Sequence, residues 1–146
     1  MNTQSKERKV VVPIDESETS LRALGVAMER ARASGATLHL LNVQPPVASG
    51  MVRMFVSQDA IDRYHAEESE RAFGPARQLL QKDQMAFKQT MRVGQAHDII
   101  AAYANPVSND EIVMGSRGMG AVGSLVLGSV ATKVIHAARV PVTLVK

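Results

Sequence analysis

The sequence predicts a single α/β domain over residues 1–146, in which a doubly wound parallel sheet of five strands, in the order 3-2-1-4-5, carries helices on both faces. Short apolar runs typical of strands alternate with segments whose apolar residues recur at helical spacing. The length of 146 residues suits one domain, and the chain has no internal repeat or linker. Strict alternation favours a parallel sheet, and winding outward in both directions from the first strand produces this order.

The first three elements follow from local signals. KVVVPI, residues 9–14, is a short apolar run that predicts a buried strand. A helix with apolar residues at helical spacing comes next, and Gly35 is its expected C-terminal cap. A second strand is expected over TLHLLNV, residues 37–43. The candidates for the N-cap of the helix are Ser17, Thr19 and Ser20.

The middle of the chain contains a long connection and a long helix. Residues 44–58 are unusually many for a connection in a compact domain; a lid or binding loop and plain disorder explain them equally well. A helix is expected over residues 59–82, with a kink or break at Gly74-Pro75. Apolar and polar residues then alternate over 87–93, which predicts a half-exposed strand.

The last elements complete the alternation. A helix begins near Ala96 and stops at Asn105-Pro106, and a fourth strand is expected over 111–115. Ser129 is the expected cap of a final helix through Ala138. A strand over residues 140–145, VPVTLV, ends the chain.

Composition narrows the class of protein. Without cysteine the chain has neither disulfides nor thiolate metal sites, and its histidines show no metal-ligand spacing. The net charge of +3 is spread out and the five aromatic residues are dispersed, so nucleic-acid binding is not expected. Residues 1–8 form a polar tail without the apolar core of a signal peptide, and no apolar run is long enough for a membrane span. We therefore expect a cytoplasmic protein that does not engage membranes.

Topology and composition point to the same place. In the predicted order, chain direction reverses between the first and fourth strands, and a crevice opens at their carboxyl ends. Residues 13–16 and 115–129 face it. No Asp or Glu occurs over residues 112–146, which contain four cations and therefore favour an anion: Arg117, Lys133, Arg139 and Lys146.

Residues 115–129 are rich in glycine, which lets backbone amides approach a phosphate at the start of a helix. Residues 118–123 match the dinucleotide pattern G-x-G-x-x-G, but no acidic residue follows to bind a ribose. Residues 123–129 have the glycine spacing of a P-loop, but no lysine precedes Ser129. Both patterns are therefore rejected.

A wider spacing is more specific. Gly115, Gly118 and, after nine intervening residues, Gly128-Ser129 reproduce G-x2-G-x9-G-[ST]. This pattern resembles the nucleotide-binding branch of the universal stress protein family, whose fold is adenine nucleotide α-hydrolase-like. The resemblance extends over nearly the whole chain, from VVVPID at 10–15 through DEIVMGS at 110–116 to VPVTLV at 140–145.

The resemblance implies a ligand and its contacts. The ligand is ATP, or ADP or AMP, with or without Mg²⁺. Pro13, Ile14, Asp15 and the backbone of Val43 line an adenosine pocket, and Met114 and Gly115 lie against the base and ribose. The resemblance also implies that the strand at 140–145 pairs with its copy in a homodimer. The groups expected to hold the phosphates are Arg117, Gly118, Gly128, Ser129 and Val130.

Three functions are open at this point. The leading one is a dimeric stress-response module, for binding or signalling, whose state depends on the bound nucleotide. The second is an enzyme, a slow ATPase or a self-phosphorylating protein, in which Asp15 orders water or metal and Ser129 or Ser116 contacts the terminal phosphate. The third is a partner-binding dimer in which the nucleotide is only structural. No catalytic residue is assigned.

Overall fold

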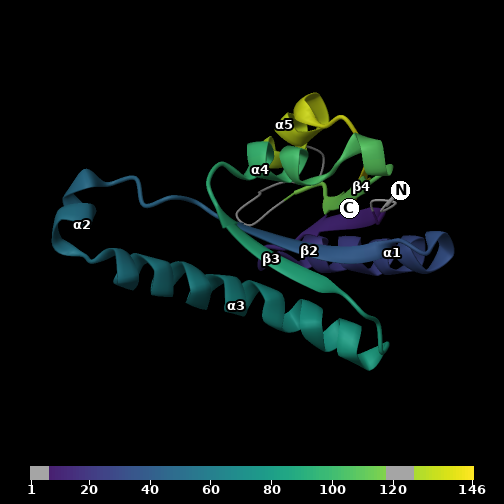
Figure 1. The fold of residues 1–146 in the computed structure, drawn as a ribbon, viewed down its shortest axis with the longest axis horizontal. Helices are drawn as coiled ribbons and strands as arrows, with labels where there is room; N and C mark the ends of the chain where they lie inside the picture. Colours follow the sequence, from purple (N-terminus) through teal and green to yellow (C-terminus); the bar gives the residue numbers. More distant parts are fainter. Residues whose placement is uncertain (1–6, 118–126) are drawn as a thin grey trace, which may run out of the picture.

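The computed structural model describes residues 7–117 and 127–146. Five parallel strands form one sheet in the order β3-β2-β1-β4-β5, which confirms the predicted fold class (Figure 1). The strands are β1 Lys9–Pro13, β2 Thr37–Gln44, β3 Lys88–Val93, β4 Glu111–Gly115 and β5 Val142–Val145. The helices are α1 Glu18–Ser34, α2 Gly50–Phe55, α3 Gln58–Lys82, α4 Ala96–Tyr103 and α5 Ser129–Ala137, with the short 3-10 helix η1 at Pro106–Ser108.

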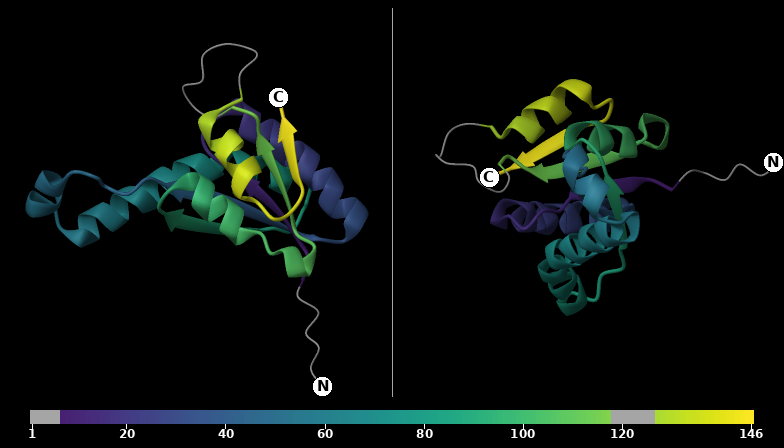
Figure 2. Two further views of the ribbon diagram at one scale, coloured as in Figure 1. Left: turned by 90° about the horizontal axis from the view of Figure 1, so that it is seen from above. Right: turned by 90° about the vertical axis from the view of Figure 1, so that its left-hand side faces the viewer.

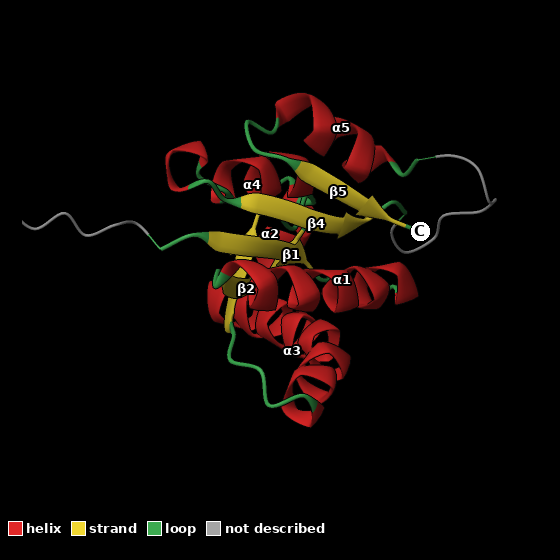
Figure 3. Ribbon diagram, turned by 90° about the vertical axis from the view of Figure 1, so that its right-hand side faces the viewer, coloured by secondary structure: helices red, strands yellow, loops and turns green. Residues whose placement is uncertain are grey.

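Helices cover both faces of the sheet, with α1 and α3 on one side and α4 and α5 on the other (Figure 3). Alternate residues of β1 divide between the two cores: Val10 and Val12 pack towards α1 and α3, and Val11 packs towards α4 and α5. All three are fully buried, as expected for a central parallel strand covered on both faces. Each core therefore holds the end of β1 in place from one side.

The ends of α1 follow the sequence signals. Ser17 is the N-cap, and its hydroxyl accepts a hydrogen bond from the backbone N–H of Ser20 at 3.2 Å. Gly35 is the C-cap in the left-handed conformation, with φ of 70°, which glycine adopts without steric cost. The start of α1, directly after β1, is thus fixed by local chemistry.

The expected break at Gly74-Pro75 is wrong, because α3 runs through Pro75 as one helix of 25 residues. Proline there removes the bond that the carbonyl of Arg71 would accept, and both residues are exposed, so water can replace it. Buried residues on either side, including Phe73 and Leu80, anchor the helix against the sheet. Packing outweighs the local defect.

The connection between β2 and α3 contains a helix, a feature that the sequence did not predict. Ser49 caps α2 by accepting a hydrogen bond from Val52 N–H at 3.3 Å, and the guanidinium of Arg53 donates to the carbonyl of Val47 at 2.7 and 2.9 Å. The segment extends to one end of the molecule, away from the sheet (Figure 1, Figure 2). Its apolar residues are largely exposed, Met54 at 80% and Phe55 at 82%.

The last two elements begin differently from the prediction. Gly128 is the N-cap of α5 and Ser129 is its first helical residue, so Ser129 does not cap the helix. β5 begins at Val142, and the carbonyl of Pro141 already accepts a hydrogen bond from Ile112 N–H at 3.0 Å. No helix within the described ranges is long and apolar enough to span a bilayer.

Candidate functional site

The crevice predicted between β1 and β4 lies where their pairing is short. β1 pairs with β2 over five residue pairs, and β4 pairs with β5 over four. The ladder between β1 and β4 consists of two pairs, Val10 with Glu111 and Val11 with Ile112. Both strands continue beyond these pairs towards their carboxyl ends. In open parallel sheets, ligands bind at this kind of switch point.

The chain after β1 is held by the neighbouring strand. Ile14 N–H donates to the carbonyl of Leu41 at 2.8 Å, and the side-chain amide of Asn42 donates to the carbonyl of Ile14 at 2.7 Å. The side chain of Ile14 is buried, while Pro13 beside it is half-buried. Asn42 is 2% exposed. Its role in holding the chain after β1 was not predicted from the sequence, although an amide side chain inside the apolar run TLHLLNV was a signal for such a role.

Asp15 lies at the start of α1 with its carboxylate turned towards the helix. Its Oδ1 accepts hydrogen bonds from the backbone N–H of Ser17, at 2.9 Å, and from the hydroxyl of Ser17. A carboxylate in this position also stabilises the positive end of the helix dipole. Both contacts use the same oxygen. Asp15 therefore has the structural role of stabilising the start of α1, and this role uses Oδ1 of its carboxylate.

Gly115 lies against the first turn of α1. A Cβ at this position would lie 2.9 Å from Oγ1 of Thr19 and 3.1 Å from its backbone carbonyl carbon. The contact with Oγ1 is closer than real Cβ atoms come to other atoms and the backbone contact is tight, so a side chain here would require Thr19 or β4 to shift. This reason for Gly115 adds to its predicted contact with a ligand.

The two ends of the glycine-rich segment are joined. The backbone N–H of Gly128 donates to the carbonyl of Ser116 at 2.8 Å, and the N–H of Ser116 donates to the carbonyl of Val145 at 2.8 Å. Ser116 is buried, at 7% exposure. The predicted contact Gly118 lies outside the described residues. Hydrogen bonds through Ser116 therefore connect the two ends of the segment to each other and to the end of β5.

The N-terminus of α5 adjoins this connection. Gly128 has no side chain to cap the helix, and Ser129 and Val130 in the first turn are exposed. Backbone N–H groups of a first helical turn have no partner within the helix and carry partial positive charge. No acidic residue lies in the first turn. This end of α5 therefore has the chemistry of an anion site.

The remaining predicted contacts belong to β2, β4 and the residues that follow β4. Met114, 5% exposed, packs in the core under α4 and α5, and half-buried Val43 packs against the same core. The carbonyl of Arg117 accepts a hydrogen bond from the hydroxyl of Thr19. Predicted site residues from β1, β4 and α5 thus meet at one edge, whereas the side chains of Ile14 and Met114 serve the core.

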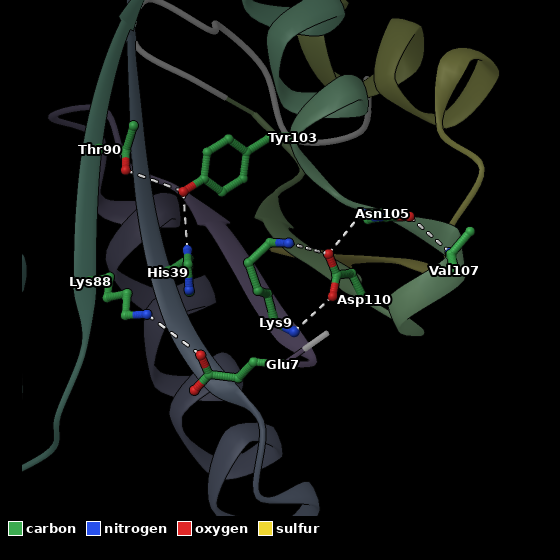
Figure 4. A network of polar contacts seen from close by, with 9 residues as sticks. All are labelled: Glu7, Lys9, His39, Lys88, Thr90, Tyr103, Asn105, Val107 and Asp110. Atoms are coloured by element: carbon green, nitrogen blue, oxygen red, sulfur yellow. Dashed lines mark hydrogen bonds and ion pairs between the residues drawn. The ribbon is translucent and has the colours of Figure 1, made fainter. Parts of the chain in front are cut away.

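A separate polar network lies near the amino ends of the strands, at the end of the sheet opposite the candidate site (Figure 4). Asp110 is fully buried and accepts hydrogen bonds from Lys9 N–H at 2.8 Å and Asn105 N–H at 2.7 Å, with Lys9 Nζ at 2.6 Å. Burial raises the pKa of Asp110, but the bonds from Lys9 and Asn105 outweigh it and lower that pKa overall. Glu7, expected in the polar tail, accepts a hydrogen bond from Thr37.

His39 belongs to the same network. Its Nδ1 lies 3.0 Å from the hydroxyl of Tyr103, which is 3.2 Å from the hydroxyl of Thr90. Its Nε2 is buried without a hydrogen-bond partner among the described residues. Burial lowers the pKa of His39, and the charges of Lys9 and Lys88 lower it further. This network stabilises the amino ends of the strands. Among the described residues, no group of His, Asp or Glu side chains could hold a metal ion.

The fold and the crevice define a doubly wound α/β protein with a candidate anion site at its switch point. The model of the Universal stress protein family matches residues 7–146, and the chain belongs to this family. A universal stress protein from Thermus aquaticus, encoded in the QAH/OAS sulfhydrylase 3′ region, is 33% identical over 95% of this chain and 98% of its own length. The resemblance read from the sequence is thereby confirmed.

Solved structures agree with this membership. Universal stress protein UspA from Lactobacillus plantarum has a TM-score of 0.79 at 22% identity, over 95% of this chain and 97% of that chain, which shows the shared fold. A universal stress protein solved in complex with cAMP has a TM-score of 0.61 at 26% identity, over 95% of this chain and 97% of that chain.

Proposed function

We propose that the protein binds an adenine nucleotide, ATP, ADP or AMP, in the crevice between β1 and β4 and acts as a dimeric stress-response module in the cytoplasm. One observation carries the proposal: the ends of the glycine-rich segment are joined at Ser116 and Gly128, beside the uncapped first turn of α5. A glycine-rich segment whose two ends are bonded to each other just before a helix N-terminus suits phosphate groups.

The proposed contacts divide between the two sides of the crevice. The phosphates lie at the start of α5, and the adenosine lies between the ends of β1, β2 and β4. Asp15 is the acidic group that we propose to contact a ribose hydroxyl or a Mg²⁺ ion accompanying the phosphates. The proposed phosphate contacts are Arg117, Gly118, Gly128, Ser129 and Val130, and the proposed adenosine contacts are Pro13, Ile14, Asp15, Val43, Met114 and Gly115.

A relative supports the class of ligand. The universal stress protein solved with cAMP shares 26% of its sequence with this chain over nearly the full length of both. The ligand bound to that protein, cAMP, is an adenine nucleotide, and the uncapped first turn of α5 is a position suited to the phosphate of such a ligand. The preference among nucleotides and any hydrolysis are separate questions, on which the proposal does not depend.

Calorimetry with ATP tests the proposal. A valine at Gly128 places a side chain at the N-cap, where the phosphates are proposed to approach, and we expect ATP affinity to fall at least about tenfold. Gly50→Val is the matched control, since a Cβ at this exposed glycine meets nothing within 4 Å. Equal ATP affinity in the wild type and Gly128→Val would remove α5 from the site. No ATP binding by the wild type would overturn the proposal.

The proposed dimer forms through β5. This strand is the last in the sheet order and pairs with β4 on one side; all four of its residues are half-buried. An edge strand of this character offers its free backbone groups to a second strand. Antiparallel pairing with the β5 of a second copy would satisfy these groups.

A further inference from the structure

The first turn of α1 connects the two loops that border the crevice. The hydroxyl of Ser17 donates to Oδ1 of Asp15, and it lies 3.2 Å from the hydroxyl oxygen of Thr19. The hydroxyl of Thr19 in turn donates to the carbonyl of Arg117. These side chains therefore lie next to one another between Asp15, two residues after β1, and Arg117, two residues after β4.

The protons of these hydroxyls are fully committed. Ser17 has one hydroxyl proton, which Asp15 accepts, and its oxygen accepts the N–H of Ser20 at 3.2 Å. Thr19 also has one, which the carbonyl of Arg117 accepts. Both side chains are buried, Ser17 at 8% and Thr19 at 7% exposure, so water does not readily replace a lost partner.

Packing holds Thr19 in position. Its Oγ1 and Cβ would lie 2.9 and 3.0 Å from a Cβ at position 115, so the absence of a side chain at Gly115 lets Thr19 come close to the end of β4. From there its hydroxyl reaches across to Arg117, 98 residues later in the chain. The contact fixes the direction in which the backbone leaves β4.

We propose that Thr19 is a positioning residue for the phosphates of the bound nucleotide, an inference that rests on the proposed function. By holding the carbonyl of Arg117, Thr19 orients the start of the glycine-rich segment, while the bond between Ser116 and Gly128 joins its two ends. Thr19 touches no ligand itself. Loss of the Thr19 hydroxyl therefore weakens the contribution of the phosphates to the binding free energy and leaves the contribution of the adenosine unchanged.

The test compares ATP with adenosine, which lacks phosphates, by calorimetry on the full chain. Thr19→Ala removes the hydroxyl, and Thr19→Ser keeps it. We expect Thr19→Ala to bind ATP about five- to tenfold more weakly, with adenosine affinity changed by less than about twofold. Thr19→Ser restores ATP binding. The control is Ser34→Ala, in which an exposed hydroxyl of the same helix loses its bond to the carbonyl of Arg30.

Three results separate the two ideas. Wild-type protein that binds no ATP overturns the proposed function, and the role of Thr19 with it. Wild-type binding together with an unchanged ratio of ATP to adenosine affinity in Thr19→Ala overturns the role of Thr19 alone. A loss of ATP binding in Thr19→Ala that Thr19→Ser does not restore also overturns it, because the hydroxyl is then not the group responsible.

A second measurement needs no ligand, so it remains usable if Thr19→Ala is too unstable for calorimetry. Amide hydrogen exchange in the free protein reports on the backbone around Ser116, with amides of α5 as the internal reference. We expect exchange at Ser116 to be about fivefold faster in Thr19→Ala than in the wild type or Ser34→Ala. Unchanged exchange at Ser116 would show that Thr19 does not hold this backbone.

Discussion

The backbone N–H of Ser116 donates to the carbonyl oxygen of Val145 at 2.8 Å, so the second residue of the glycine-rich segment is bonded to the end of β5. The carbonyl of Ser116 holds Gly128 at the same distance. One residue thus joins β4, the edge strand β5 and the N-cap of α5.

Gly115→Ala should destabilise the protein. The added Cβ would lie 2.9 Å from Oγ1 of Thr19 and 3.1 Å from its carbonyl carbon, and backbone at this distance does not yield easily. Urea denaturation should show a free energy of unfolding lower by about 1–3 kcal/mol. Gly25→Ala is the control, because its Cβ meets nothing within 4 Å and alanine is favoured within a helix. Equal stability of the two variants would contradict the close packing.

Asp110→Asn should destabilise the protein by about 1–3 kcal/mol at neutral pH, because it removes the buried negative charge that faces the half-buried ammonium group of Lys9. The lowered pKa of Asp110 sets the pH dependence. Stability from this carboxylate is fully present above the ordinary value of 3.8 and is lost as the pH falls through the lower native pKa. The difference between wild type and variant should therefore shrink in acid. Denaturant titrations between pH 7 and pH 3 measure it, with exposed Asp98→Asn as the control.

His39 should remain neutral below the pH at which an ordinary histidine takes up a proton. Its pKa is lowered, first by burial and then by Lys9 and Lys88, so the unfolded chain binds this proton more readily than the native protein. Stability is therefore lost as the pH falls below the ordinary value of 6.5. An NMR titration of the imidazole should give a pKa below 6.5, and His39→Gln should flatten the stability profile between pH 7 and pH 5. A higher imidazole pKa would contradict this.

Val142→Pro should dissociate the proposed dimer while leaving each chain folded. Pro141 and Val145 direct their carbonyls to β4, so the alternation of a strand turns the backbone N–H of Val142 towards the open side of the sheet. Proline removes that N–H without removing a bond to β4. Sedimentation velocity should show monomers for the variant and dimers for the wild type, with unchanged circular dichroism. Dimers in the variant would place the interface elsewhere.

Much of the fold could be predicted because strong local patterns agree with the global topology. Buried runs such as KVVVPI and EIVMG, separated by capped helices, allow few arrangements other than the observed sheet. Pro75 misled the prediction because a local rule was applied without knowledge of packing: its missing bond falls on the exposed side of α3. The N-cap of α5 was predicted one residue too late, at Ser129 instead of Gly128, because serine is the commoner cap.

The candidate site could be located from the sequence, but its internal support could not. Glycine spacing and strand order identify the edge of the sheet independently of each other. By contrast, Asn42 and Thr19 act across distances of 28 and 98 residues in the chain, and such contacts have no signature in a local pattern. Thr19 was noticed only as a possible cap, a role that Ser17 fills.

The bond between Ser116 and Val145 has a consequence for how the two proposed interactions of the protein relate. The strand offered to a second subunit and the loop offered to a nucleotide share a backbone contact, so a displacement of one alters the other. Thermodynamic linkage is reciprocal: if pairing of subunits strengthens nucleotide binding by some factor, the nucleotide strengthens pairing by the same factor. Protein concentration would then set the apparent nucleotide affinity, and the nucleotide would set the concentration at which subunits assemble.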